Sequence, residues 1–302
     1  MRLLSLTLVA ESVRLAVPYA CAALAGVWCE RSGIVNIALE GVLLSSAFGT
    51  MAFTLATGSP VLGLLGGLLS GAMLSLVHGT LAAKYRIDAI VSGVALNLLA
   101  ASGTRFLLQA WYGSSSNSPA FTSFEFGPEG ASGAQMLART LMDPVTVLAI
   151  IAIAITPWIL TKTRFGLRLR AVGEDPTAAA SVGIDVVRVR LVATLVSGTI
   201  GALGGAHLAL DQHRFESGMS GGRGVIALAA VILAGWRPVR AALVCLVFAT
   251  LEATQILLQD ARWLPNQLMQ TLPYVATLFV LAFAASRSRA PAGLGKHSTI
   301  VG

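Results

Sequence analysis

The sequence predicts an all-α fold, a polytopic bundle of transmembrane helices that forms a single membrane domain over residues 1–302. Hydrophobic residues make up 55% of the chain and charged residues only 12%, about half of the ~25% that a soluble domain carries. Apolar runs of about the 20 residues that cross a bilayer recur along the chain. The 31 glycines suit helices whose backbones pack closely in a membrane.

About nine spans are predicted from these runs. They cover residues 12–29, 34–56, 60–83, 88–111, 145–160, 191–210, 224–236, 239–258 and 268–285. The first run follows a leader that resembles a signal peptide, but the charged residues Glu11 and Arg14 interrupt it early. We therefore expect a retained first span.

The basic residues orient these spans. Most of the 21 Lys and Arg lie at residue 31, at 84–86, in the loop 162–190, at 237–240 and in the tail 287–302. With the predicted spans, these segments all fall on the same side of the membrane. Cytoplasmic connections are enriched in Lys and Arg, so this side and the C-terminus are predicted to be cytoplasmic and the N-terminus to be outside. The net charge of +7 thus reflects topology, and no nucleic-acid partner is expected. Cys21, Cys29 and Cys245 show no metal-ligand spacing and are predicted to be buried thiols.

The predicted span 224–236 is too short to cross comfortably as a straight helix, and it follows the glycine-rich run GMSGGRG at 218–224. This pattern predicts broken or re-entrant backbone. The similar strings GIVNIA at 33–38 and GVIALA at 224–229 would run in opposite directions across the membrane. Paired glycine-interrupted segments of opposite direction are typical of an inverted repeat.

The longest charged connection, 162–190, reads KTRFGLRLRAVGEDPTAAASVGIDVVRVR. Asp175 is suited to cap a helix and Pro176 to begin one. Small residues follow, and Gly183 is suited to end the helix. The loop therefore predicts a short helix that lies in water at the cytoplasmic end of the bundle.

This loop closely resembles the cytoplasmic coupling loop of permease subunits of bacterial ABC importers. The nearest group is the one for nucleosides and simple sugars, which is related to ribose and branched-chain amino acid permeases. ERSGIVNIALEG at 30–41, VSGVALNLLA at 91–100 and GRGVIALAAVILAGWRP at 222–238 resemble the same family. Many such loops carry Glu-Ala-Ala, three residues and then Gly. Ala178, Ala179 and Gly183 fit this spacing, but Thr177 stands in place of the Glu.

The resemblance implies a permease subunit of the bacterial plasma membrane that forms the pathway for nucleosides or simple sugars. It implies a second permease subunit, homologous or identical, and an extracytoplasmic solute-binding protein. It also implies two ATPase subunits, which bind the ATP, so that no cofactor is expected in this chain. The residues to which it assigns ATPase coupling are Gly166, Arg168, Arg170, Gly173, Glu174, Asp175, Pro176, Ala178, Ala179 and Gly183.

Three polar residues within predicted spans are candidates for the substrate pathway. Asn36 and Glu40 lie four residues apart, which predicts one face of a helix, and Asn97 lies in the middle of its span. Polar groups in a membrane tend to face the bundle interior or an aqueous cavity. They either line a pathway or hydrogen-bond neighbouring helices. For His78, Arg105, His207 and Glu252 the structural interpretation is favoured.

Enzyme motifs are missing from the sequence: it contains no phosphate-binding GxxxxGK[ST], no HExxH and no zinc-ligand spacing. The chain is therefore not expected to be an enzyme, and uphill transport would need a partner ATPase or an ion gradient. The alternative is a self-sufficient ion-coupled transporter, in which Glu40 and Glu252 would exchange protons. Two isolated acids and a large basic loop favour the ATP-driven system.

Overall fold

The computed structural model describes residues 6–124, 133–258, 275 and 289–296, and eleven helices lie within them. They are α1 (Leu6–Glu30), α2 (Leu39–Thr57), α3 (Pro60–Ala83), α4 (Ala89–Tyr112), α5 (Gly133–Met142), α6 (Pro144–Lys162), α7 (Arg164–Glu174), α8 (Pro176–Ser181), α9 (Val186–Gln212), α10 (Arg223–Leu233) and α11 (Pro238–Leu258).

Seven of these helices (α1, α2, α3, α4, α6, α9 and α11) are long and apolar enough to cross a membrane. Each matches a predicted span. The eighth prediction, 224–236, corresponds to α10, an apolar helix of only 11 residues. The ninth, 268–285, lies outside the described residues except for Val275. The described residues thus support seven spans and one short helix, and the predicted count of about nine is not confirmed.

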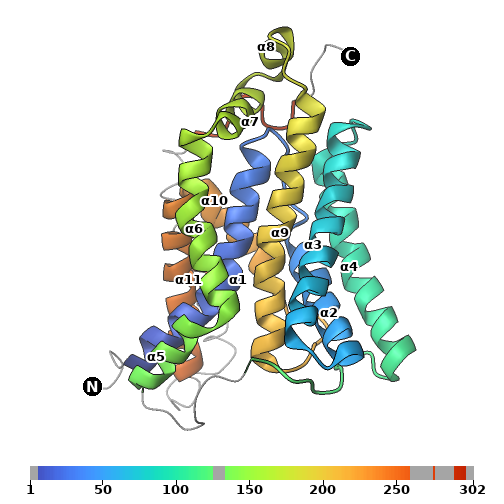
Figure 1. Cartoon of the computed structure of the whole chain (residues 1–302), viewed down its shortest axis with the longest axis vertical. Coiled ribbons are helices and arrows are strands. Elements are labelled where there is room, and N and C mark those ends of the chain that lie inside the picture. The colour runs from blue at the N-terminus through green and yellow to red at the C-terminus, as the bar shows by residue number, and fades with distance from the viewer. Residues whose placement is uncertain (1–5, 125–132, 259–274, 276–288, 297–302) are drawn as a thin grey trace.

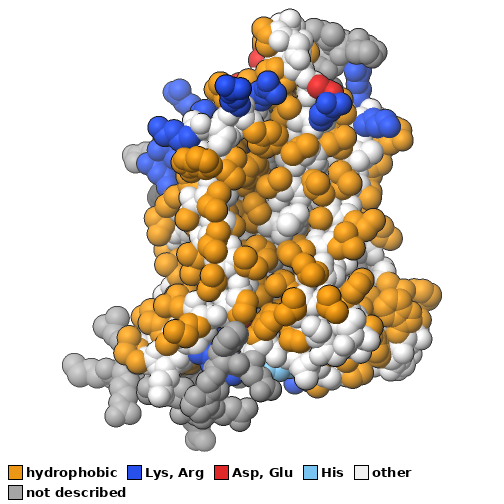
Figure 2. All heavy atoms as spheres, viewed as in Figure 1, with side chains coloured by type: hydrophobic (Ala, Val, Ile, Leu, Met, Phe, Trp, Pro, Cys, Tyr) orange, Lys and Arg blue, Asp and Glu red, His pale blue; other side chains and the backbone are white. Residues whose placement is uncertain are grey.

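The long helices form one bundle (Figure 1). α1 and α9 pack against each other in its middle, with α6 and α11 on one flank and α2, α3 and α4 on the other. α7 and α8 lie at one end, and α5 and the start of α1 lie at the opposite end. Apolar side chains cover the flanks in the view of Figure 2, whereas Lys and Arg gather at the α7–α8 end. This distribution is that of a multi-pass membrane protein.

The contacts of helices α1–α3 and α9–α11 correspond in pairs. α3 packs against α9, and α11 likewise packs against α1. α2 contacts α9, and α10 likewise contacts α1. α10 begins at Arg223 and ends near Trp236, whose carbonyl oxygen accepts a hydrogen bond from Arg31 at the end of α1. α10 therefore runs in the direction of α1, and α2 runs in the direction of α9. The six-residue match proposed above is wrong, however, because 33–38 is not helical whereas 224–229 lies in α10.

Small residues allow α3 and α9 to approach closely. A Cβ atom added to Gly198 would lie 2.4 Å from the Cβ of Ser75, and one added to Gly71 would lie 2.7 Å from the Cβ of Ala202. The Ser75 hydroxyl donates to the carbonyl oxygen of Thr194 across the same interface, at 2.7 Å. Close backbone packing and side-chain hydrogen bonds hold membrane helices together, because burial of apolar surface contributes little between helices in lipid.

The connections contain two helices that were not predicted. α5 lies between residues 112 and 142, and α7 lies in the loop 162–190 before the expected short helix. α7 begins where the Thr163 hydroxyl accepts a hydrogen bond from the backbone N–H of Gly166, at 3.1 Å. The three cysteines are buried and free, as predicted.

Candidate functional site

The chain between α1 and α2 crosses part of the bundle without helical structure. The second span was expected to begin at residue 34, but α2 begins at Leu39 and residues 34–37 form neither helix nor turn. Asn36 lies in this segment and is buried. Asn36 and Glu40 therefore do not share a helix face, because the helical spacing on which that prediction rested does not extend to Asn36. Residues 31–38 are called the junction segment below.

The start of the junction segment is bound to the end of α10. The side chain of Glu30 is buried, and its carboxylate accepts hydrogen bonds from the indole N–H of Trp236 and from the backbone N–H of Asn36. The Arg31 guanidinium donates to the carbonyl oxygen of Trp236, at 3.1 Å. Glu30 therefore connects one end of the junction segment with the turn that follows α10, some 200 residues later in the chain.

The middle of the junction segment is bound to α9 and to the C-terminal tail. The buried Arg190, near the start of α9, donates from Nε to the carbonyl oxygen of Ser32 at 3.1 Å and from Nη2 to that of Lys296 at 2.8 Å. The backbone N–H of Gly295 donates to the carbonyl oxygen of Gly33 at 2.9 Å. One arginine thus joins the tail to the junction segment.

The end of the junction segment is bound to α3 and α4. The Val35 carbonyl oxygen can only accept, so the facing Nε2 of His78 donates to it, at 3.0 Å. Asn97 donates from Nδ2 to the carbonyl oxygen of Ile37 at 2.9 Å and accepts the backbone N–H of Gly41 at 2.7 Å. Asn97 therefore binds backbone groups on both sides of the point where α2 begins. Such groups need partners because unpaired backbone is costly in a membrane.

Asn36 retains unused hydrogen-bonding capacity. Its Nδ2 donates to the hydroxyl of Ser197 in α9, at 3.2 Å. Its Oδ1 is buried and has no hydrogen-bond partner among the described residues. Most buried polar atoms in proteins have a partner. This amide oxygen is thus an unused acceptor among the described residues.

Glu40 joins the starts of the two interrupted helices. It lies in the first turn of α2, and its two carboxylate oxygens accept the backbone N–H groups of Gly222, at 2.8 Å, and Gly224, at 2.7 Å. These donors stand at the N-terminus of α10, where a helix favours an anion. As predicted, the backbone before α10 is irregular, with Gly222 at φ +78°. The N-termini of α2 and α10 therefore meet inside the bundle.

Glu252 is held by a cation. Its carboxylate accepts from the Arg223 guanidinium at 2.6 Å and from the Tyr19 hydroxyl at 2.8 Å. The pair links α11 to the first residue of α10 and to α1. This arrangement is the structural role that was favoured for Glu252.

The end that carries α7 and α8 agrees with the helix signals of the loop. Asp175 accepts the backbone N–H groups of Thr177 and Ala178, both at 2.9 Å, and Pro176 begins α8. Gly183 follows α8 with φ +83°, a left-handed conformation that favours glycine. Of the assigned coupling residues, Gly166, Gly173, Pro176 and Ala179 are buried, Arg170 is partly buried, and Arg168, Glu174, Asp175, Ala178 and Gly183 are exposed.

α7 also contacts the junction segment and the tail. A Cβ atom added to Gly173 would lie 2.1 Å from the carbonyl oxygen of Arg31, so the two backbones touch. Gly293 donates to the carbonyl oxygen of Gly173 at 2.9 Å, and the backbone N–H of Ala292 donates to the Glu174 carboxylate at 3.1 Å. The described tail therefore lies at the α7–α8 end.

Residues 8–281 match the family model described as "Branched-chain amino acid transport system / permease component". The chain belongs to this family. It is thus a transmembrane permease component, a class of transport subunit rather than of enzyme.

Similar proteins cover almost the whole permease. The guanosine ABC transporter permease protein NupQ of Bacillus subtilis is 37% identical over 93% of this chain and 92% of its own length. The nucleoside ABC transporter permease protein NupC of Lactococcus lactis is 34% identical over 94% of each chain. The putative glucose ABC transporter permease protein TsgC13 of Haloferax volcanii is 32% identical over 86% of this chain and 85% of its own length.

The structure brings Asn36, Glu40 and Asn97 to one region of the permease, where α2 and α10 begin. Sequence reasoning missed Glu30, Arg190 and Trp236, which bind the same region. A signal for two of them existed, because Glu30 and Arg190 are charged residues at the ends of apolar runs, where burial requires partners. The partners themselves lie too far away in the sequence to be recognised from spacing.

Proposed function

We propose that this permease carries nucleosides into the cell as part of an ATP-binding cassette importer. The observation that supports this proposal most directly is its similarity, over nearly its full length, to permeases named for guanosine and for nucleosides. Simple sugars are the second candidate, because a putative glucose permease is also similar, at lower identity. ATP is bound and hydrolysed by separate subunits in this proposal, and the chain itself holds no cofactor.

The proposed pathway passes the place where α2 and α10 begin, with Asn36, Glu40 and Asn97 at its side. The free Oδ1 of Asn36 supports this placement. Nucleosides are neutral and rich in hydroxyl and amino groups, which amide and carboxylate oxygens accept. Interrupted helices whose ends meet within the membrane are where many transporters bind solute, and the two inverted halves move against each other around that site.

The proposed ATPase contact is the exposed face of α7 and α8. Movement of α7 would reach the junction segment directly, through Gly173 and Arg31, and indirectly through the tail. A larger side chain at Gly293 would collide with the carbonyl oxygen of Gly173, which a Cβ atom would approach to 2.8 Å. Gly293→Val is therefore expected to separate ATP hydrolysis from uptake. Normal coupling in this variant would show that the tail does not transmit the movement.

The remaining partners follow from this orientation. The α7–α8 end and the tail would face the cytoplasm, the start of α1 would face outside, and an extracytoplasmic solute-binding protein would dock at that outer end. A second permease subunit, homologous or identical, would complete the pathway in the plasma membrane. Apolar flank surfaces would contact membrane lipid.

The test is uptake by proteoliposomes that contain the permease pair and its ATPase, supplied with the solute-binding protein. Radiolabelled guanosine is expected to accumulate when ATP is present on the ATPase side, and unlabelled nucleosides are expected to compete whereas glucose is not. If glucose competed and nucleosides did not, simple sugars would replace nucleosides as the proposed solutes. Uptake that needs a proton gradient but no ATP would instead support the ion-coupled alternative and its acids Glu40 and Glu252.

A further inference from the structure

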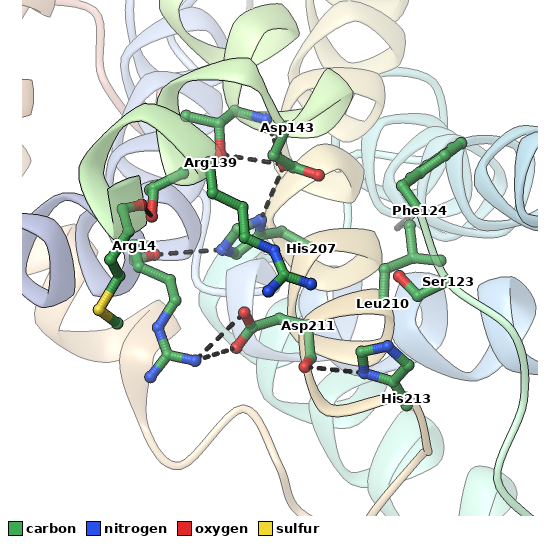
Figure 3. A pocket seen from close by; sticks show the side chains of 12 residues that line it. Arg14, Ser123, Phe124, Arg139, Asp143, His207, Leu210, Asp211 and His213 are labelled. Atoms are coloured by element: carbon green, nitrogen blue, oxygen red, sulfur yellow. Dashed lines mark hydrogen bonds and ion pairs between the residues drawn. The ribbon is translucent and has the colours of Figure 1, made fainter. Parts of the chain in front are cut away.

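The outer end of the bundle contains a cavity with a volume of about 290 Å³ between α1, α5, α6 and α9 (Figure 3). This volume is at the lower limit of small-molecule sites, which measure about 300–1,000 Å³. The cavity lies at the end opposite α7 and α8. A solute that enters from outside would meet it before the junction segment.

Most charged groups around the cavity are already paired. Arg14 donates to both carboxylate oxygens of Asp211, at 3.2 and 3.0 Å, and to Glu11. The Asp143 carboxylate accepts the backbone N–H of Thr146 at 2.8 Å and lies 3.6 Å from Nδ1 of His207. These pairs hold two aspartates in fixed positions on the cavity wall. A carboxylate has about four acceptor sites, so each aspartate can still accept a hydrogen bond from a ligand.

Asp143 stays ionised at neutral pH. Burial alone would raise its pKa, but the hydrogen bond and charge of His207, together with the hydrogen bonds of Thr146, outweigh burial and place the pKa below its ordinary value. Asp143 is thus an acceptor and not a donor towards the cavity.

Arg139 differs from the other charged residues of the cavity. Within the part of the chain that the structure describes, its guanidinium has neither a hydrogen bond nor an ion pair. Figure 3 shows it extending from α5 into the space between His207 and Asp211. A guanidinium offers five N–H donors in a planar fork, which matches two adjacent acceptors. The cavity therefore combines an unpaired double donor with carboxylate acceptors.

We propose that this cavity is an outer binding site for the base of an oxopurine nucleoside. Arg139 would bind the ring carbonyl and the neighbouring ring nitrogen, the pair of acceptors by which arginine recognises guanine. Asp211 or Asp143 would accept N–H groups of the same base. Adenine fits less well, because an amino donor replaces its carbonyl acceptor and would face the guanidinium. The inference rests on the proposed nucleoside transport and deepens it by naming the base.

The test measures binding of radiolabelled guanosine, inosine and adenosine to the permease–ATPase membrane complex in nanodiscs, without the solute-binding protein. Arg139→Gln is expected to weaken guanosine binding about 5- to 150-fold, the value of one good bidentate contact, with little effect on adenosine. Arg105→Gln is the matched control, because Arg105 is exposed near the same end and donates to Ser217 outside the cavity. It should bind guanosine as the wild type does.

A second variant serves if Arg139→Gln does not assemble. Ser123 lines the cavity without a hydrogen bond from its side chain among the described residues, so Ser123→Trp fills the space and breaks no such bond. It should abolish guanosine binding. Unchanged guanosine binding in either assembled variant, or equal affinity for adenosine and guanosine in the wild type, would refute this binding site. The proposed nucleoside transport would not be affected by that result. Absent guanosine uptake by the wild-type transporter would instead refute the proposed function itself.

Discussion

Replacement of Glu40 by Gln tests whether the contact between the starts of α2 and α10 stabilises the permease. In the wild type, both carboxylate oxygens accept backbone N–H groups, at 2.8 and 2.7 Å. Gln keeps the length of the side chain but presents an NH₂ group in place of one oxygen. That NH₂ group would face the N–H of Gly222 or Gly224, so one donor would lose its acceptor.

The structure gives the size of the expected effect. A buried donor left without an acceptor costs about 1–3 kcal/mol, and a bond to a neutral acceptor is weaker by about 1 kcal/mol than one to a charged acceptor. The sum is about 2–4 kcal/mol. Because Glu40 is partly exposed, water can replace part of the loss, and we expect about 2 kcal/mol. For a chain of this size that corresponds to a fall in melting temperature on the order of 5 °C.

The assay is thermal unfolding of the purified membrane complex, followed by size-exclusion chromatography with fluorescence detection, together with uptake in proteoliposomes. Glu216→Gln is the matched control, because the Glu216 side chain is 45% exposed and its carboxylate lies 3.8 Å from Arg214, a contact that contributes little at a surface. Equal melting temperatures for the two variants would refute the stabilising role of Glu40. Lost uptake at an unchanged melting temperature would indicate that protonation of Glu40 is part of the cycle.

Three further predictions concern the pathway, the coupling end and the orientation. Asn97→Leu should reduce both uptake and melting temperature, since it leaves two backbone groups beside the start of α2 unpaired at about 1–3 kcal/mol each; wild-type values for both would exclude Asn97 from either role. Gly183→Trp should abolish solute-stimulated ATP hydrolysis and ATPase co-purification. Gly183→Ala shares the backbone strain but not the bulk, and it should keep both. Glu174→Arg should also uncouple ATP hydrolysis from uptake. If co-purification and stimulated hydrolysis survive in Gly183→Trp and in Glu174→Arg, the ATPase docks elsewhere. In a background without the native cysteines, Ser116→Cys should react with an impermeant thiol reagent in whole cells, and Ser181→Cys should react only after lysis. Labelling of both in whole cells would contradict the cytoplasmic position of α8 and, with it, the proposed ATPase contact.

Elements determined by local chemistry could be predicted from the sequence. Asp175 and Pro176 cap and begin α8 because both act on backbone groups within three residues. The long spans were found because each is an apolar run of bilayer length. The glycines at 218–224 correctly predicted the irregular start of α10. The local signal for α7 also existed, since Thr163 caps it, but α7 was not predicted.

The junction segment could not be predicted in the same way. Ile34, Val35 and Ile37 continue an apolar pattern, and nothing in their spacing distinguishes a helix from an extended chain. Their conformation depends on hydrogen bonds from α3, α4, α9, α10 and the tail, the nearest of which is more than forty residues away. Of the three pathway candidates, Asn36 is buried and Glu40 and Asn97 are partly buried, and the helix face predicted to be shared by Asn36 and Glu40 was wrong.

The irregular junction segment determines how deep in the membrane α2 begins. Four residues, such as 34–37, reach about 13 Å when extended and about 6 Å when helical. Winding them into α2 would therefore shorten the connection by about 7 Å, more than one helical turn, and would draw the ends of α1 and α2 together. Hydrogen bonds from α3, α4, α9 and the tail oppose this shortening. The depth of a helix terminus in this membrane protein is thus set by side chains that lie outside that helix, and a mutation in α3, α4 or α9 can move it without any change in the sequence of α2.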